Sequence, residues 1–156
     1  MNIVTTRFGT IQVPNESLLL IPEGLVGFRS YTQFVYWVDP EVEELYWLQS
    51  ATEPGLAFAL VPPPISAGDY RVELRPGDRA SLELEDERDA IVQVILNRGD
   101  GGLTVNLQGP LVINPVRRLG RQLVLTSSRY AVRYPLGSPD APPTLLPGPV
   151  ALRATA

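Results

Sequence analysis

Apolar and polar residues alternate with a period of two along several short stretches of the chain. The pattern is clearest at residues 103–107, where every second residue is apolar, as in a strand with one buried face. Pro110 interrupts the ladder, because proline has no backbone N–H to donate. Two more apolar segments follow at residues 111–113 and 123–125, separated by a turn at residues 117–120. We predict a β meander in this region.

Similar patterns predict further strands from the N-terminus onward. Residues 34–38 are aromatic and β-branched, and residues 56–61 are apolar on both faces, which is typical of a central strand. Other predicted strands cover residues 3–8, 11–13, 17–21, 45–50, 69–74 and 90–96. A proline and an aspartate predict a short helix at residues 79–84, and residues 29–33 fit a single helical turn. The predicted fold class is therefore all-β and mainly antiparallel, a small β-barrel or strongly curved sheet with one or two short helices.

The composition changes after Leu136. The 136 residues up to that point carry all the predicted strands and are long enough to form one domain with a buried core. Residues 137–156 are rich in proline and alanine and contain few bulky apolar side chains. Such a segment buries too little surface to offset the entropy of ordering it. We predict a single β domain at residues 1–136 and a flexible C-terminal tail at residues 137–156.

The residue inventory leaves little room for catalysis. The chain contains no histidine and no cysteine, so the commonest general base, the commonest metal ligand and the thiolate nucleophile are all missing. We therefore predict a protein that is not an enzyme, with no catalytic residue, no cofactor and no metal site. No apolar run approaches the ~20 residues needed to cross a bilayer, and the first residues do not form a secretory signal. These features predict a cytoplasmic protein with no membrane partner.

Charge narrows the choice of partner. The formal net charge is −4, which disfavours phosphate backbones and favours basic proteins. Residues 83–89 form the densest acidic run, and they lack the spaced oxygen ligands and central glycine of a calcium loop. The run is either a solvated face or a docking surface for a cationic partner. The candidate partner-binding residues are Glu83, Glu85, Asp86 and Glu87.

Short motifs spread over residues 3–136 form an ordered set. The residues that define them are Pro22, Glu23, Gly24, Gly27, Phe28, Gln49, Ser50, Phe58, Asn106, Pro110, Asn114 and Gln122. In order and spacing, this set resembles the FliW family of flagellar assembly factors. Asn106 and Asn114 also fit hydrogen bonding in turns or at strand ends. The chain departs from the family pattern in its proline-rich tail and in its glycine-rich loop at residues 97–102.

The resemblance implies a cytoplasmic binding protein with no chemistry of its own. FliW-like proteins bind newly made flagellin and also the RNA-binding translational regulator CsrA. While flagellin accumulates it occupies FliW, and CsrA is free to repress translation of flagellin mRNA. After flagellin is exported, FliW binds and antagonises CsrA and relieves the repression. An acidic barrel would be attracted to a basic regulator at low salt, and a flagellin segment would need an exposed groove or strand edge.

An alternative reading is a small acidic β-barrel module that binds nucleic acid or a small ligand. In that case the aromatic residues of the central strands would form a base-stacking platform instead of a core. Arginines would also have to gather on one face beside exposed aromatic residues. The arginines available for this are Arg117, Arg118, Arg121, Arg129 and Arg133.

Overall fold

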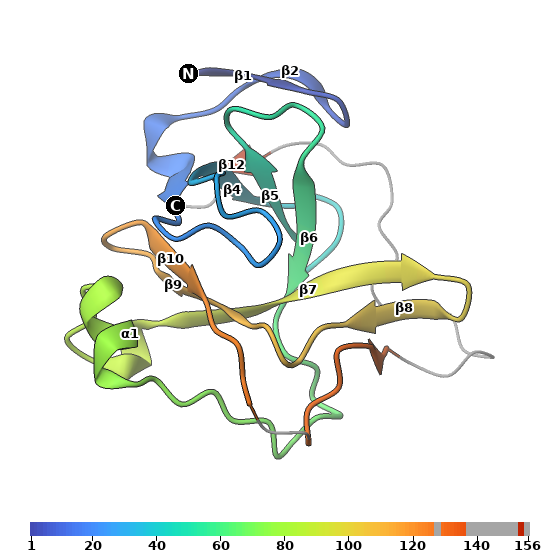
Figure 1. Ribbon diagram of the computed structural model, residues 1–156. Helices are drawn as coiled ribbons and strands as arrows, with labels where there is room; N and C mark the ends of the chain where they lie inside the picture. Colours follow the sequence, from blue (N-terminus) through green and yellow to red (C-terminus); the bar gives the residue numbers. More distant parts are fainter. Residues whose placement is uncertain (127–128, 137–152, 155–156) are drawn as a thin grey trace.

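The fold is built almost entirely from short strands (Figure 1). A computed structural model of the chain describes residues 1–126, 129–136 and 153–154. The strands are β1 (Asn2–Thr5), β2 (Gly9–Gln12), β3 (Leu18–Leu20), β4 (Gln33–Val38), β5 (Tyr46–Ser50), β6 (Ala57–Val61), β7 (Ile91–Gly99), β8 (Gly102–Val105), β9 (Leu111–Asn114), β10 (Leu119–Gln122), β11 (Tyr134–Pro135) and β12 (Arg153–Ala154). The helical segments are α1 (Pro76–Ser81) and the 3-10 turns η1 (Asn15–Ser17) and η2 (Glu87–Asp89).

Seven of these strands close into a barrel. Their order is β7-β6-β5-β4-β3-β10-β9, and β9 pairs back with β7. All neighbours are antiparallel except β3 and β10, which run parallel. Strand β7 makes the closure possible, because its first residues pair with β9, its middle with β6 and its last residues with β8. The predicted all-β class and small barrel are confirmed.

The alternation along β4 explains the core. Phe34 and Tyr36 point into the barrel, where they pack with apolar residues of β3, β5, β6 and β9. Val35 and Trp37 point outward into a second cluster with residues of β5 to β8. The β1–β2 hairpin, in blue in Figure 1, contributes Ile3 and others to that cluster and so covers the outer face of the barrel wall. Because both faces are buried, the strand is apolar at nearly every position.

A third cluster covers another part of the outer wall. Leu82 and Leu84, just after α1, pack with Val112 of β9 and with Leu123. Helix α1 confirms the short helix predicted here, but it begins at Pro76. Proline suits the first helical position because its fixed φ matches the helix and its missing N–H has no partner there anyway. The long connection from β6 to β7 is thereby held against the barrel.

Several local predictions were wrong. Residues 29–30 form a turn, residues 31–32 are irregular and Gln33 begins β4, so the predicted helical turn is absent, and residues 69–74 form no strand. The strand after β9 is β10, which lies just before the predicted segment at residues 123–125. Strand β8 pairs with β7 and β11 and does not pair with β9, so the region is not a simple meander. The predicted tail at residues 137–156 lies outside the described residues except for β12, which pairs with β4, and that prediction stays untested.

Candidate functional site

The loop at residues 22–28 lies against the barrel interior and depends on two glycines. Gly24 has a φ of +67°, and a Cβ there would lie 2.5 Å from the Cα of Arg29. Gly27 has a φ of +85°. Both conformations favour glycine. Leu25, between them, is buried in the interior cluster. These glycines of the family motif therefore serve the shape of the loop.

Phe28 closes this loop with an aromatic contact. Its ring meets the ring of Phe58 edge-on, with centroids 5.5 Å apart. Phe28 remains partly exposed, as does Val26. The loop thus presents a small apolar surface beside the barrel.

Gln122 ties that loop to the turn before β9. Its side-chain oxygen accepts a hydrogen bond from the Val26 N–H at 2.8 Å. Its amide nitrogen donates to the carbonyl oxygen of Gly109 at 3.0 Å. In the same turn, Asn106 Oδ1 accepts bonds from the N–H groups of Gln108 and Gly109. This is the turn hydrogen bonding that the sequence predicts at Asn106.

Gln49 and Ser50 shape the turn between β5 and β6. Gln49 is fully buried, and its amide nitrogen donates to the carbonyl oxygens of Ser50, Glu53 and Pro54. Ser50 Oγ accepts bonds from the N–H groups of Thr52 and Glu53. These two motif residues satisfy backbone groups that the turn would otherwise leave unpaired.

Asn114 performs the same task at the end of β9. Its amide nitrogen donates to the carbonyl oxygen of Leu82 at 2.8 Å. Its Oδ1 accepts from the N–H groups of Val116 and Arg117. This residue therefore fixes both the β9–β10 turn and the end of α1, as turn chemistry predicts.

Pro110 supplies the carbonyl oxygen that accepts a bond from the Leu123 N–H.

Glu23 of the motif takes part in a charge network. Arg121 donates to the Glu23 carboxylate and, from Nε, to Asp78 Oδ1 at 3.0 Å. Asp78 is almost completely buried, and its other oxygen accepts from the Arg75 N–H at 2.9 Å. The network connects the loop at residues 22–28, strand β10 and helix α1. Burying a carboxylate is favourable only with such partners.

The acidic run lies between α1 and β7 and is partly neutralised by neighbouring arginines. Glu83, Glu85 and Glu87 are exposed and Asp86 is half-buried. Asp86 pairs with Arg88 at 2.8 Å, and the hydrogen bonds from Arg88 lower the pKa of the Asp86 carboxyl. Glu83 lies 3.8 Å from the Nε of an arginine in the β9–β10 turn. The role of these four residues in binding stays a prediction.

Most arginines of the nucleic-acid alternative are bound by groups of this chain. The ion pairs are Arg117 with Glu83, Arg121 with Asp78 and Glu23, and Arg129 with Asp69. Arg118 donates to the backbone oxygen of Asn15. These arginines therefore do not form a free cationic face. In the described part of the chain, no helix is long and apolar enough to cross a membrane.

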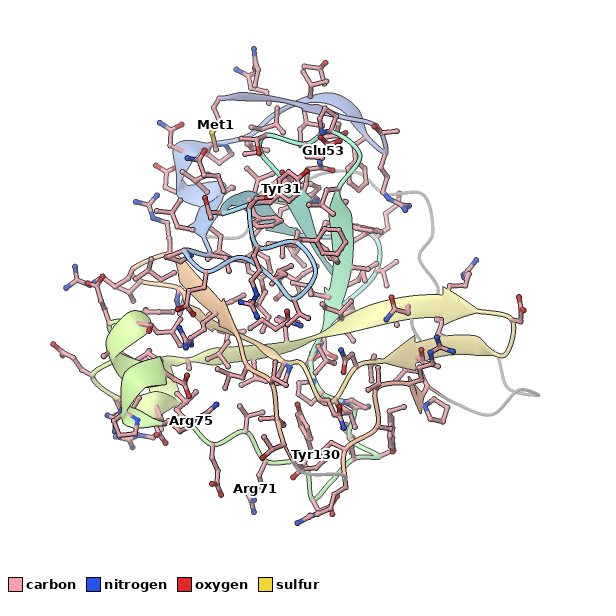
Figure 2. The ribbon with its side chains drawn as sticks, viewed as in Figure 1. Met1, Tyr31, Glu53, Arg71, Arg75 and Tyr130 are labelled. Carbon is pink, nitrogen blue, oxygen red and sulfur yellow. The ribbon has the colours of Figure 1, made fainter. Side chains whose placement is uncertain are left out.

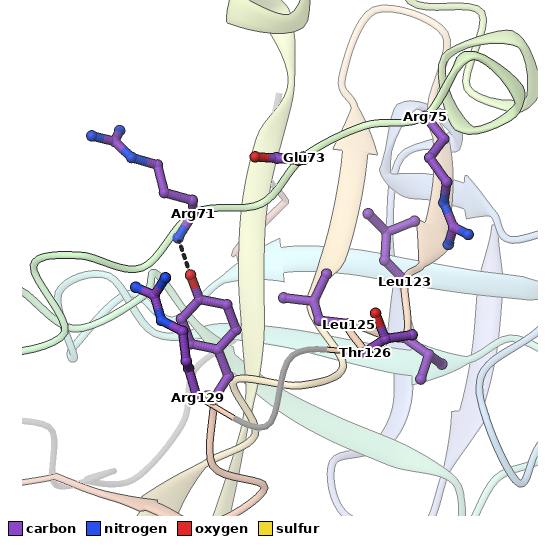
Figure 3. Close-up of a pocket in the computed structure, with 9 residues that line it drawn as sticks. Arg71, Glu73, Arg75, Leu123, Leu125, Thr126 and Arg129 are labelled. Atoms are coloured by element: carbon purple, nitrogen blue, oxygen red, sulfur yellow. Dashed lines mark hydrogen bonds between the residues drawn. The ribbon is translucent and has the colours of Figure 1, made fainter.

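A groove that has no direct signature in the sequence opens between residues 71–75 and 123–126. It has a volume of about 390 Å³ (Figure 3). Leu123 and Leu125 belong to the third core cluster and form its apolar floor. Its polar lining residues are Arg71, Glu73, Arg75, Thr126, Arg129 and Tyr130. Figure 2 shows Arg71, Arg75 and Tyr130 at the end of the molecule opposite Met1 and Glu53.

Tyr130 anchors one end of the groove. Its hydroxyl accepts a hydrogen bond from the Arg71 N–H at 3.1 Å, the dashed line in Figure 3. Its ring meets Tyr70 edge-on with centroids 4.8 Å apart, and the Arg129 guanidinium lies 5.5 Å from its centroid. Tyr70 in turn donates to the carbonyl oxygen of Leu107 at 2.7 Å. Burial raises the pKa of Tyr70 above its ordinary value, so this hydroxyl keeps its proton and its hydrogen bond.

The lining of the groove offers groups for ion pairs, hydrogen bonds and apolar contacts. Guanidinium groups, one carboxylate, one threonine hydroxyl and leucine side chains include no base placed against a nucleophile. The signal in the sequence was the alternation at residues 71–75. Val72 and Leu74 face the core while Arg71, Glu73 and Arg75 face solvent. That alternation predicted a strand but not an open groove beside it.

Comparison with known proteins gives consistent matches over the barrel. The family model described as FliW protein matches residues 2–136. A flagellar assembly factor FliW of Moorella thermoacetica is 37% identical over 139 residues, covering 87% of this chain and 88% of the relative. The FliW of Geobacter sulfurreducens is 36% identical over 137 residues, covering 86% of each. A crystal structure of the flagellar assembly factor FliW superposes with a TM-score of 0.79 at 30% identity, covering 90% of this chain and 100% of that one.

Proposed function

The chain belongs to the FliW family, and from this membership we propose that it acts in flagellar assembly as a non-enzymatic, cytoplasmic binding protein. Its first partner is flagellin. Once flagellin has been exported, the protein binds and antagonises a CsrA-type translational regulator and so relieves repression of flagellin mRNA translation. The match of the family model over residues 2–136 carries this proposal, because it spans the whole barrel.

The regulatory effect follows from linked equilibria. If flagellin and the regulator bind this protein with negative coupling, each lowers the affinity for the other by the same factor. Free regulator then rises and falls with the amount of unexported flagellin. No reaction is required, which agrees with a sequence that contains neither histidine nor cysteine.

Electrostatics supports a basic partner. The formal net charge is −4, and Glu83, Glu85 and Glu87 project into solvent on one connection. CsrA-type regulators carry basic RNA-binding surfaces, so opposite charge would accelerate the encounter at low salt. The effect on RNA binding can still be allosteric, with charge steering the approach and not competing for the RNA site.

Two measurements test the proposal. A pull-down with the tagged full-length protein from the native cytoplasm should recover flagellin and the CsrA-type regulator. Calorimetry with the purified regulator should then show binding that flagellin reduces. Recovery of nucleic acid instead, and retention of single-stranded RNA on a filter by the purified protein, would favour the nucleic-acid alternative.

A charge-reversal variant tests the acidic run. Replacing Glu83, Glu85 and Glu87 by lysine should weaken regulator binding and flatten its dependence on salt. A matched control replaces Glu41 and Glu43, exposed residues of the β4–β5 turn, by lysine. If both variants bind as the unchanged protein does, the acidic run is not the contact surface.

A further inference from the structure

One wall of the groove offers backbone groups that have no partner among the described residues. The N–H of Leu123 donates to the carbonyl oxygen of Pro110 at 2.9 Å, and the N–H of Leu125 donates to that of Gln108 at 2.8 Å. In extended chain, successive residues direct their backbone groups to opposite sides. The N–H and C=O of Val124 therefore point away from residues 108–110 and toward the groove. Among the described residues, nothing hydrogen-bonds to them.

The facing wall has the same property. At its ends, the Arg71 N–H donates to the Tyr130 hydroxyl and the Arg75 N–H donates to the Asp78 carboxylate. Between these anchors, the N–H groups of residues 72–74 make no hydrogen bond within the described part of the chain. Burial alternates along residues 71–75, as in an extended segment, and Arg75 at its end has extended dihedral angles (φ −77°, ψ 159°). The segment is hydrogen-bonded at both ends, and no described strand pairs with either of its edges.

Two extended walls with unpaired backbone groups form a template for an added strand. The floor between them is apolar, and the outward side chains are mostly cationic. An incoming strand would direct alternate side chains down toward Leu123 and Leu125 and up toward the arginines. We propose that this groove binds an extended, acidic segment of a partner protein by strand addition.

Charge identifies the occupant as acidic. The molecule as a whole is negative, yet the groove is lined by three arginines and a single glutamate. Arg129 pairs with Asp69 at 2.9 Å, and Arg75 lies 3.6 Å from Asp78. Arg71 makes no ion pair with any described residue and is exposed, and in Figure 3 its side chain leads away from Leu123 and Leu125. Arg71 is the cation available to a carboxylate of the occupant.

This inference goes beyond the proposed function, because it concerns the chemistry of a segment and requires neither flagellin nor the regulator. The probe is a capped peptide of about eight residues in which valine and glutamate alternate. Valine would face the leucine floor, and glutamate would face Arg71. Binding is followed by amide chemical shifts of the full-length, isotope-labelled protein during titration.

We expect the amide chemical shifts of residues 72–74 and Val124 to change during the titration and to reach a plateau at high peptide concentration. Arg71→Glu should weaken binding by about fivefold or more, while the matched control Arg98→Glu, on the exposed β7–β8 hairpin, should not. A valine–lysine peptide should not bind. A peptide with N-methylated backbone amides should also lose binding, because it keeps the side chains but lacks the donors for a ladder.

Other outcomes overturn the proposal. Chemical-shift changes confined to another surface would show that the peptide does not bind in the groove. Equal binding of the N-methylated peptide would show that it does not bind by strand addition. Equal binding of the lysine peptide, or equal binding by the Arg71→Glu variant, would show that the occupant need not be acidic. An oligonucleotide that shifted the same amides more strongly than the peptide would assign the groove to nucleic acid. None of these results depends on whether flagellin or the regulator is recovered in the pull-down.

Discussion

Strand β4 and the segment at residues 71–75 have the same local conformation and opposite environments. Both are extended, and both alternate in the direction of their side chains. Strand β4 is paired with β3 and β5 and buried on both faces, with Trp37 fully inaccessible. Residues 71–75 have one half-buried and one exposed face, and no described strand pairs with either edge. Alternation therefore predicts which faces are covered, whereas pairing is decided by the neighbours that the fold supplies.

The contrast separates stability from recognition. In β4 both edges of the backbone are paired, and the side chains of residues 34–37 are buried. In residues 71–75 the inward side chains and the N–H groups of Arg71 and Arg75 contact the rest of the protein, whereas the N–H groups of residues 72–74 have no partner among the described residues. We expect a substitution to lower the free energy of unfolding more when the groups that it removes make more contacts within the protein.

The largest effect is expected in β4. Trp37→Ala should lower the free energy of unfolding by about 3–5 kcal/mol, because it empties a large fully buried volume between β4 and the β1–β2 hairpin. Chemical denaturation measures the change. Ile65→Ala is the matched control, since this apolar side chain is 98% exposed. Equal effects at the two positions would contradict the assignment of Trp37 to the core.

The second largest loss of stability is expected at a glycine that has no room for a side chain. Gly24→Ala should cost about 2 kcal/mol, because the residue has a positive φ and its Cβ would overlap the backbone of Arg29. Gly77→Ala in α1 is the control, because a Cβ there meets nothing within 4 Å. We expect that control to be neutral or stabilising by thermal denaturation. A harmless Gly24→Ala would mean that the loop at residues 22–28 is adaptable.

A smaller loss of stability is expected at Gln122, which connects the loop at residues 22–28 to the turn before β9. Gln122→Ala removes the bonds to Val26 and Gly109 and should cost about 1–2 kcal/mol. Faster hydrogen exchange at the Val26 amide would confirm that this bond is the one lost. Gln12→Ala on the exposed side of β2 is the matched control. If both variants unfold at the same denaturant concentration, Gln122 does not stabilise the loop.

The smallest effect on stability is expected in the groove. Arg71→Ala should change the free energy of unfolding by no more than about 0.5 kcal/mol, because its guanidinium is exposed and unpaired among the described residues. Denaturation of this variant is the measurement. A loss comparable to that of Gln122→Ala would show that Arg71 supports the fold, and the contrast with β4 would fail.

The sequence predicted the fold class well because alternation survives in most strands. Residues 34–38 were predicted as a strand, and β4 covers Gln33–Val38. Strand β10 was missed because Leu119, Gly120, Arg121 and Gln122 have no apolar alternation. Its extended form comes from pairing with β9 and β3. Pairing partners are distant in the chain and leave no local signature.

The candidate site was only partly accessible from sequence. The motif residues were found, and the hydrogen bonds of Asn106 and Asn114 were predicted, because turn chemistry is local. The exposure of Glu83, Glu85 and Glu87 also follows from their density of charge. The groove was missed because its walls are far apart in the sequence and only the closed barrel brings them together. Open backbone edges cannot be recognised until all strand partners are known.

The long strand β7 has a consequence for synthesis. Closure requires β9 to return to the first residues of β7 and β10 to reach β3, and both closing strands are made after the other barrel strands. A nascent chain that ends before Leu111 therefore holds β3 to β7 as an open sheet with bare edges. Such edges pair readily with other chains. A ribosome that stalls in this interval leaves an aggregation-prone intermediate, and the hazard ends once residues 111–122 have left the ribosome and paired with β7 and β3.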